Sequence, residues 1–156
     1  SVFQITLSVQ VDEAWSARPV DEERNIRSDI AGMCVLLAED NEINCEIVKF
    51  MLEEAGAKVV TANDGKAAAE AFAASELGGF DCVLMDLMMP VMSGYEATRV
   101  IRSLERPDAG TVPIIALSAN AFEEDVAMAK DAGMNEHLAK PVDINKMFKV
   151  IRRLKR

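Results

Sequence analysis

Three short stretches of the chain place charged side chains directly after runs that predict buried strands. Glu39 and Asp40 follow the first run, Asp86 follows the second, and Lys140 follows the third. A parallel sheet brings the carboxyl ends of its strands together, so three carboxylates and one ammonium would meet in a single crevice. Such a cluster suits a divalent cation together with a phosphoryl group carried on an aspartate.

The elements that must position these side chains form an alternating series. Short apolar runs predict strands at residues 33–38, 58–62, 81–85, 113–117 and 137–139. Helical periodicity places apolar residues on one face of the first helix, namely Ile43, Ile47, Met51, Leu52 and Ala55. The last helix does the same with Ile144, Met147, Phe148, Ile151 and Leu154. Five strand–helix units predict a doubly wound α/β fold with a parallel sheet, right-handed crossovers and helices on both faces.

The first 32 residues have a different pattern. Residues 1–11 alternate between apolar and polar side chains, which predicts one half-buried strand. Residues 12–32 are charged and polar with little periodicity, which predicts a linker. The globular domain is therefore expected at residues 33–156.

Composition narrows the classes of function. The net charge of −9 argues against nucleic acid as a partner. His137 is the only histidine, so a histidine-rich metal site is excluded. Cys34, Cys45 and Cys82 lie in apolar runs and are interpreted as reduced core residues of a cytoplasmic protein. We expect no signal peptide, no membrane contact and no membrane-spanning segment, because no apolar run is long enough.

Four motifs in register identify a family. They are LLAEDN at 36–41, DLMMPVMSG at 86–94, IIALSANA at 114–121 and HLAKP at 137–141. With these motifs, residues 33–156 resemble the receiver domain of two-component signalling proteins. The resemblance implies a flavodoxin-like, five-stranded parallel sheet in the order 2-1-3-4-5.

The resemblance also assigns a phosphoryl-accepting site. Asp86 matches the aspartate that receives a phosphoryl group from a phosphohistidine. Asp40 and Asp86 match direct ligands of Mg²⁺, and the backbone carbonyl of Met88 matches the third protein ligand. Glu39 is expected to act on the metal through water.

Further roles follow from the same resemblance. Lys140 matches the lysine that pairs with the acceptor and then with the phosphoryl oxygens, and its bond to Pro141 is expected to be cis. Ser118 matches the hydroxyl residue that reaches a phosphoryl oxygen after activation. His137 occupies the aromatic switch position, usually Tyr or Phe in the family.

Residues flanking the site are expected to tune it. Met88 and Asn120 match the positions that line the path of hydrolytic water, so they are predicted to set the lifetime of the phosphoryl group. Ile43, Asn44 and Ile47, at the start of the first helix, are predicted to form a docking patch for a phosphotransfer helix bundle. The alternative is that Ile43 and Ile47 belong to the core.

The N-terminal strand suggests where the receiver comes from. Residues 1–7 resemble the final strand of the histidine-kinase ATPase domain, and a receiver follows that domain in hybrid kinases. We therefore expect a phosphorelay module. It would take the phosphoryl group from the dimerisation and phosphotransfer domain of its parent kinase and pass it to a separate histidine phosphotransfer protein. Beyond its own phosphorylation and dephosphorylation, we expect no enzymatic activity of this segment.

The sequence also allows simpler interpretations of these charged residues and other functions for this fold. Glu39 and Asp40 could cap a helix, and Lys140 could be a solvated surface lysine. A phosphorylation-independent pseudo-receiver would use the same fold as an interaction domain. A haloacid-dehalogenase-type phosphatase also uses a strand-end aspartate and Mg²⁺. That family has a second aspartate two residues after its nucleophile, where this chain has Met88.

Overall fold

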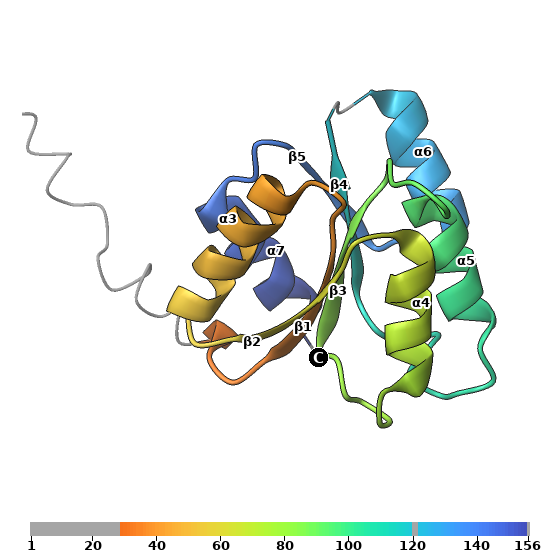
Figure 1. Ribbon diagram of the computed structural model, residues 1–156, viewed down its shortest axis with the longest axis horizontal. Helices are drawn as coiled ribbons and strands as arrows, with labels where there is room; N and C mark the ends of the chain where they lie inside the picture. Colours follow the sequence, from red (N-terminus) through yellow and green to blue (C-terminus); the bar gives the residue numbers. More distant parts are fainter. Residues whose placement is uncertain (1–28, 120–121, 156) are drawn as a thin grey trace, which may run out of the picture.

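The computed structural model describes residues 29–119 and 122–155. These residues form a three-layer α/β domain in which a single sheet lies between two groups of helices (Figure 1). Residues 1–11 and most of the predicted linker lie outside the described residues, as does Asn120.

The sheet is parallel throughout, with its five strands in the order β2-β1-β3-β4-β5. The strands are β1 (Cys34–Ala38), β2 (Lys58–Ala62), β3 (Cys82–Asp86), β4 (Ile114–Ser118) and β5 (Glu136–Ala139). The predicted fold and strand order are confirmed. The central strands β3 and β4 are buried along their whole length, which explains why they appear in the sequence as unbroken apolar runs.

The helices divide between the two faces of the sheet. They are α3 (Glu42–Glu54), α4 (Gly65–Ala74), α5 (Gly94–Ser103), α6 (Glu123–Ala132) and α7 (Ile144–Leu154). Figure 1 shows α3 and α7 on one face and α4, α5 and α6 on the other. One hydrophobic core lies on each side of the sheet, so both faces are shielded from water. No helix in the described part of the chain is long and apolar enough to cross a membrane.

The prediction for α7 is confirmed, whereas that for α3 is partly wrong. In α7, Met147, Phe148 and Ile151 are buried. In α3 the buried residues are Val48 and Leu52, while the side chain of Ile43 is 72% exposed. The buried face of α3 is therefore turned about the helix axis relative to the predicted one, toward Val48 and Leu52.

The described domain includes residues ahead of β1. Ile30 is fully buried and belongs to the hydrophobic core on the side of the sheet that α3 and α7 cover, although it falls within the predicted linker. Asp29 forms an ion pair with Arg152 at 3.0 Å and accepts a hydrogen bond on its backbone oxygen from Lys155 at 3.0 Å. These contacts attach the end of the predicted linker to α7.

Candidate phosphoryl-acceptor and metal site

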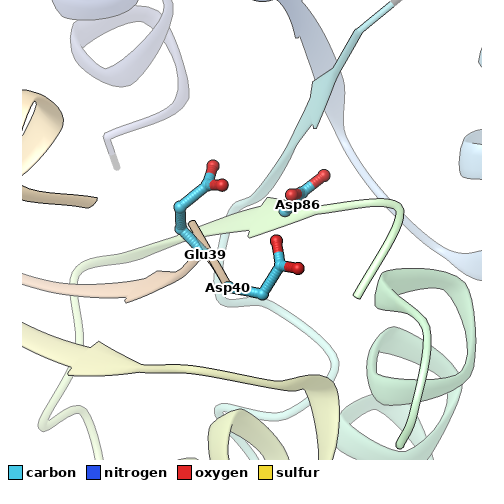
Figure 2. Close-up of side chains that lie close together, drawn as sticks. All are labelled: Glu39, Asp40 and Asp86. Atoms are coloured by element: carbon cyan, nitrogen blue, oxygen red, sulfur yellow. The ribbon is translucent and has the colours of Figure 1, made fainter. Parts of the chain in front are cut away.

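Three carboxylates meet at the carboxyl ends of two neighbouring strands. Glu39 and Asp40 directly follow β1, and Asp86 is the last residue of β3, as Figure 2 shows. One oxygen from each carboxylate lies within 4.8 Å of the others. Glu39 and Asp86 are buried, whereas Asp40 is exposed. An all-oxygen donor set with one solvent-facing ligand fits a hard divalent cation such as Mg²⁺, which retains several waters when bound.

Lys140 joins two of these carboxylates. Its Nζ lies 2.8 Å from Oδ2 of Asp86 and 2.6 Å from Oε2 of Glu39. The expected pairing with Asp86 is therefore present. Glu39 was expected only to act through water on a metal, and its direct contact with the lysine is an additional finding. The bond between Lys140 and Pro141 is cis, as expected.

Burial and pairing shift the pKa values of the central pair. Desolvation raises the pKa of Asp86, and the hydrogen bonds from Lys140 and from the backbone of Met88 only partly offset this effect. Desolvation lowers the pKa of Lys140, but its bonds to Asp86 and Glu39 outweigh it, so that pKa lies above its ordinary value. Lys140 thus remains positively charged in the crevice.

The loop between β3 and α5 places Met88 beside Asp86. The Met88 N–H donates to Oδ1 of Asp86 at 3.1 Å, while the Met88 side chain is 76% exposed. At the end of the loop, the Gly94 N–H donates to the carbonyl of Leu87 at 3.1 Å. A Cβ at Gly94 would lie 2.1 Å from the backbone oxygen of Asp86, so only glycine allows the end of the loop to approach the Asp86 backbone this closely.

The two predicted switch residues lie on adjacent strands. Ser118 is the last residue of β4 and is buried, and its backbone oxygen accepts a hydrogen bond from the Lys140 N–H at 2.7 Å. His137 lies on β5 and is partly exposed, with Nδ1 3.9 Å from Oε1 of Glu136. The fold therefore puts Ser118 and Asp86 at the carboxyl ends of neighbouring strands. The switch roles themselves stay predictions.

The start of α3 presents apolar side chains to solvent. Ile43 is 72% exposed and Ile47 is 48% exposed, so these side chains are not core. Asn44 donates from Nδ2 to Oε1 of Glu39 at 3.4 Å, which links the patch to the site. Phe50, 64% exposed, extends the same face. Phe50 lies three residues after Ile47, a spacing that places both on one helix face, but the predicted patch did not include Phe50.

Comparisons with known proteins agree with this geometry. A family model described as the response regulator receiver domain matches residues 35–152. Hybrid signal transduction histidine kinase I of Dictyostelium discoideum is 37% identical over 119 residues, covering 75% of this chain and 7% of that kinase. The peroxide stress-activated histidine kinase mak1 of Schizosaccharomyces pombe is 41% identical over 122 residues, covering 78% of this chain and 7% of its own length. The chain thus matches only a small part of these curated relatives.

Solved structures are similar over most of the domain. The receiver domain of sensor histidine kinase PA1611 from Pseudomonas aeruginosa, with a magnesium ion in its active site cleft, has a TM-score of 0.72 and 39% identity. The match covers 80% of this chain and 98% of that one. The receiver domain of Saccharomyces cerevisiae Ssk1, crystallised with the histidine phosphotransfer protein Ypd1, also matches. It has a TM-score of 0.72 and 32% identity, and the match covers 80% and 90% of the two chains.

Proposed function

The chain belongs to the response regulator receiver domain family of two-component signalling, and on that premise we propose that Asp86 accepts a phosphoryl group in a phosphorelay. The observation that carries the proposal is the arrangement of Lys140 between the carboxylates of Glu39 and Asp86, at 2.6 and 2.8 Å. Burying these charges costs desolvation energy, so the ion pairs are expected to add little to the stability of the fold. The arrangement suits a site that handles an anionic group.

The proposed reaction assigns each side chain a task. An Asp86 carboxylate oxygen attacks the phosphorus of a phosphohistidine in line, the P–N bond breaks, and the imidazole nitrogen leaves with the electron pair. Asp40, Asp86 and the Met88 carbonyl would hold Mg²⁺, which would neutralise the developing negative charge. Lys140 then pairs with the phosphoryl oxygens, and Ser118 donates its hydroxyl to one of them.

The partners in this proposal are proteins that carry a histidine. The donor is the dimerisation and phosphotransfer domain of a parent hybrid kinase, and the acceptor is a histidine phosphotransfer protein. The exposed patch of Ile43, Asn44 and Ile47 is the proposed docking surface. It adjoins an apolar groove between α3 and the segment after β5. The similarity to a receiver crystallised with a phosphotransfer protein supports a partner of this kind.

The proposed chain organisation follows the sequence. The receiver spans residues 33–156, residues 12–32 form the linker, and residues 1–11 are the last strand of a kinase ATPase domain. The burial of Ile30 in the core supports adding the end of the linker to the receiver body. Met88 and Asn120 are proposed to set the lifetime of the phosphoryl group, and His137 with Ser118 to carry the conformational switch.

Labelling with a small phosphodonor tests the function. The protein is incubated with acetyl phosphate and Mg²⁺, and the mass shift is followed before and after acid treatment. We expect an acid-labile adduct that is absent in Asp86→Asn and present in Asp131→Asn, a matched change at an exposed aspartate on α6. Full labelling of Asp86→Asn would refute the assignment. An unlabelled wild type would indicate a pseudo-receiver, and continuous phosphate release would indicate a phosphatase.

A further inference from the structure

The N-terminus of α4 is in unusually close contact with the loop that carries Met88. The Gly65 N–H donates to the backbone oxygen of Met92 at 3.1 Å. A Cβ built on Gly65 would lie 2.3 Å from that oxygen and 2.9 Å from the backbone oxygen of Ser93. Side chains larger than hydrogen are therefore excluded at this position, and the missing side chain lets the loop reach the helix.

The Gly65 end of the contact is rigid. Asp64 caps α4, and its Oδ1 accepts a hydrogen bond from the Ala67 N–H at 2.8 Å. A capped first turn holds its free N–H groups in fixed directions. The Gly65 N–H is therefore a fixed donor, to which the loop must adapt.

The loop end of the contact is held under strain. The Met92 N–H donates to the backbone oxygen of Pro90 at 2.7 Å, closing a tight turn around Val91. Val91 has a φ of 67°, a left-handed conformation that a β-branched residue rarely adopts. Strain of this kind persists only where surrounding contacts impose it. The bond from Gly65 to Met92 is such a contact.

The same loop touches the acceptor carboxylate at its other end. The Met88 N–H donates to Oδ1 of Asp86 at 3.1 Å, as described above. Between Met88 and Met92 the chain is short and its turn is closed by a hydrogen bond, so a displacement at Met92 is transmitted toward Met88. One continuous set of backbone contacts thus connects α4 with Asp86.

We propose that Gly65 is a positioning residue for the acceptor site. Through Met92 and the turn at Val91, it sets the position of the Met88 backbone, and with it both the N–H given to Asp86 and the carbonyl offered to Mg²⁺. The inference rests on the proposed function, because it takes Asp86 and the Met88 carbonyl as Mg²⁺ ligands. It adds a residue from a helix that supplies no ligand.

The size of the effect follows from the close contact. Real Cβ atoms are essentially never under 3.0 Å from such an oxygen, so alanine at position 65 would force the first turn of α4 and the Met92 carbonyl apart by at least 0.7 Å. Changes in residues that orient metal ligands typically weaken metal binding by roughly 10- to 100-fold. For Gly65→Ala we expect Mg²⁺ binding at least ~10-fold weaker than wild type.

A matched variant separates positioning from general damage. In Gly79→Ala the new Cβ would lie 2.9 Å from the backbone oxygen of Glu76, a milder overlap of the same kind on the loop that precedes β3, away from its carboxyl end. Mg²⁺ dissociation constants are measured by calorimetry, and unfolding midpoints are measured without metal. We expect Gly79→Ala to lower the midpoint but to keep the wild-type dissociation constant. Equal Mg²⁺ affinity in Gly65→Ala and Gly79→Ala would overturn the proposal.

The wild-type protein provides a second test that needs no variant. Coupling between two sites is reciprocal, so Mg²⁺ should strengthen the contact between Gly65 and Met92. Hydrogen exchange followed by NMR should show the Gly65 amide slowed by Mg²⁺. The Gly79 amide, which donates to Glu76 at 2.9 Å, should be unchanged. An unaffected Gly65 amide in protein that binds Mg²⁺ would overturn this inference alone, whereas no Mg²⁺ binding at all would overturn the proposed function with it.

Discussion

Replacing Lys140 by methionine should reveal how the cluster of Glu39, Asp86 and Lys140 is stabilised. The change keeps an apolar stem of similar length but removes the ammonium that lies between two buried carboxylates. The side chains of Glu39 and Asp86 are only 1% and 7% exposed, so water compensates poorly for the lost charge. Breaking a buried ion pair on one side typically costs roughly 3–5 kcal/mol.

Protonation sets an upper limit on this cost. Once Asp86 takes up a proton, the repulsion and much of the desolvation penalty disappear. Protonating a carboxyl group with an ordinary pKa costs roughly 4 kcal/mol at pH 7, at about 1.4 kcal/mol per pH unit. We therefore expect Lys140→Met to lower the free energy of unfolding by about 3–4 kcal/mol at pH 7 without metal.

The pH dependence of the loss has a definite sign. In the variant, the folded-state pKa of Asp86, already raised by burial in the wild type, rises further, while the unfolded-state pKa does not change. The folded variant then binds a proton that the unfolded chain releases, so its stability relative to wild type falls as pH increases above about 4. At pH 5 the deficit should be near 1.5 kcal/mol, at about 1.4 kcal/mol per pH unit.

Urea unfolding in EDTA and in Mg²⁺ measures both effects. Because the variant site has lost its internal cation, it should bind Mg²⁺ more tightly than wild type, and Mg²⁺ should recover part of the lost stability. Lys140→Arg, which keeps the charge, is the control. Wild-type stability of Lys140→Met in EDTA at pH 7, or weaker Mg²⁺ binding, would refute the electrostatic reasoning.

Three further changes test other parts of the structure. Ile30→Ala should lower the free energy of unfolding by about 2–5 kcal/mol in urea titrations, because the side chain is fully buried. Removing residues 1–28 should leave the free energy of unfolding nearly unchanged. Val91→Gly should raise the free energy of unfolding by about 1 kcal/mol, because the relief of left-handed backbone strain exceeds the entropic cost of glycine. A lower unfolding midpoint in this variant would contradict the prediction. Ile43→Ser should slow phosphoryl transfer to a phosphotransfer protein with little change in stability, while Leu77→Ser, an equally exposed control, should leave transfer unaffected.

The fold was predictable because its signals are local. Each central strand is covered on both faces, so burial alone produces an unbroken apolar run such as residues 82–85. The exposed face of α3 was not predictable in the same way. Ile43 and Ile47 have the spacing of a core face, and periodicity cannot distinguish a surface kept apolar for a partner from one covered by a sheet.

The positions of the acidic residues were also predictable, whereas their detailed contacts were not. Strand order brings Asp40 and Asp86 to one edge whatever their rotamers, so topology suffices to predict the cluster. The bond between Lys140 and Glu39 depends on side-chain reach across the crevice, which no sequence spacing encodes. The contact of Gly65 with Met92 joins the start of α4 to a loop that is distant in sequence. Only the packed structure shows that a Cβ on Gly65 would lie 2.3 Å from the Met92 oxygen, which requires glycine there.

On the proposed function, the charge of the crevice gives a reason for metal and phosphoryl group to act together. Three carboxylates and one ammonium leave a net charge of about −2, which repels an incoming phosphoryl donor. A bound divalent cation would cancel this charge before transfer. Phosphorylation of Asp86 would replace its charge by about −2, so the proposed site would hold about −1 with the cation and about −3 without it. Lys140 alone cannot offset that excess in a buried setting. The phosphorylated state should therefore depend on Mg²⁺ more strongly than the unmodified fold does, and on Lys140 for the remaining stabilisation of the phosphoryl oxygens.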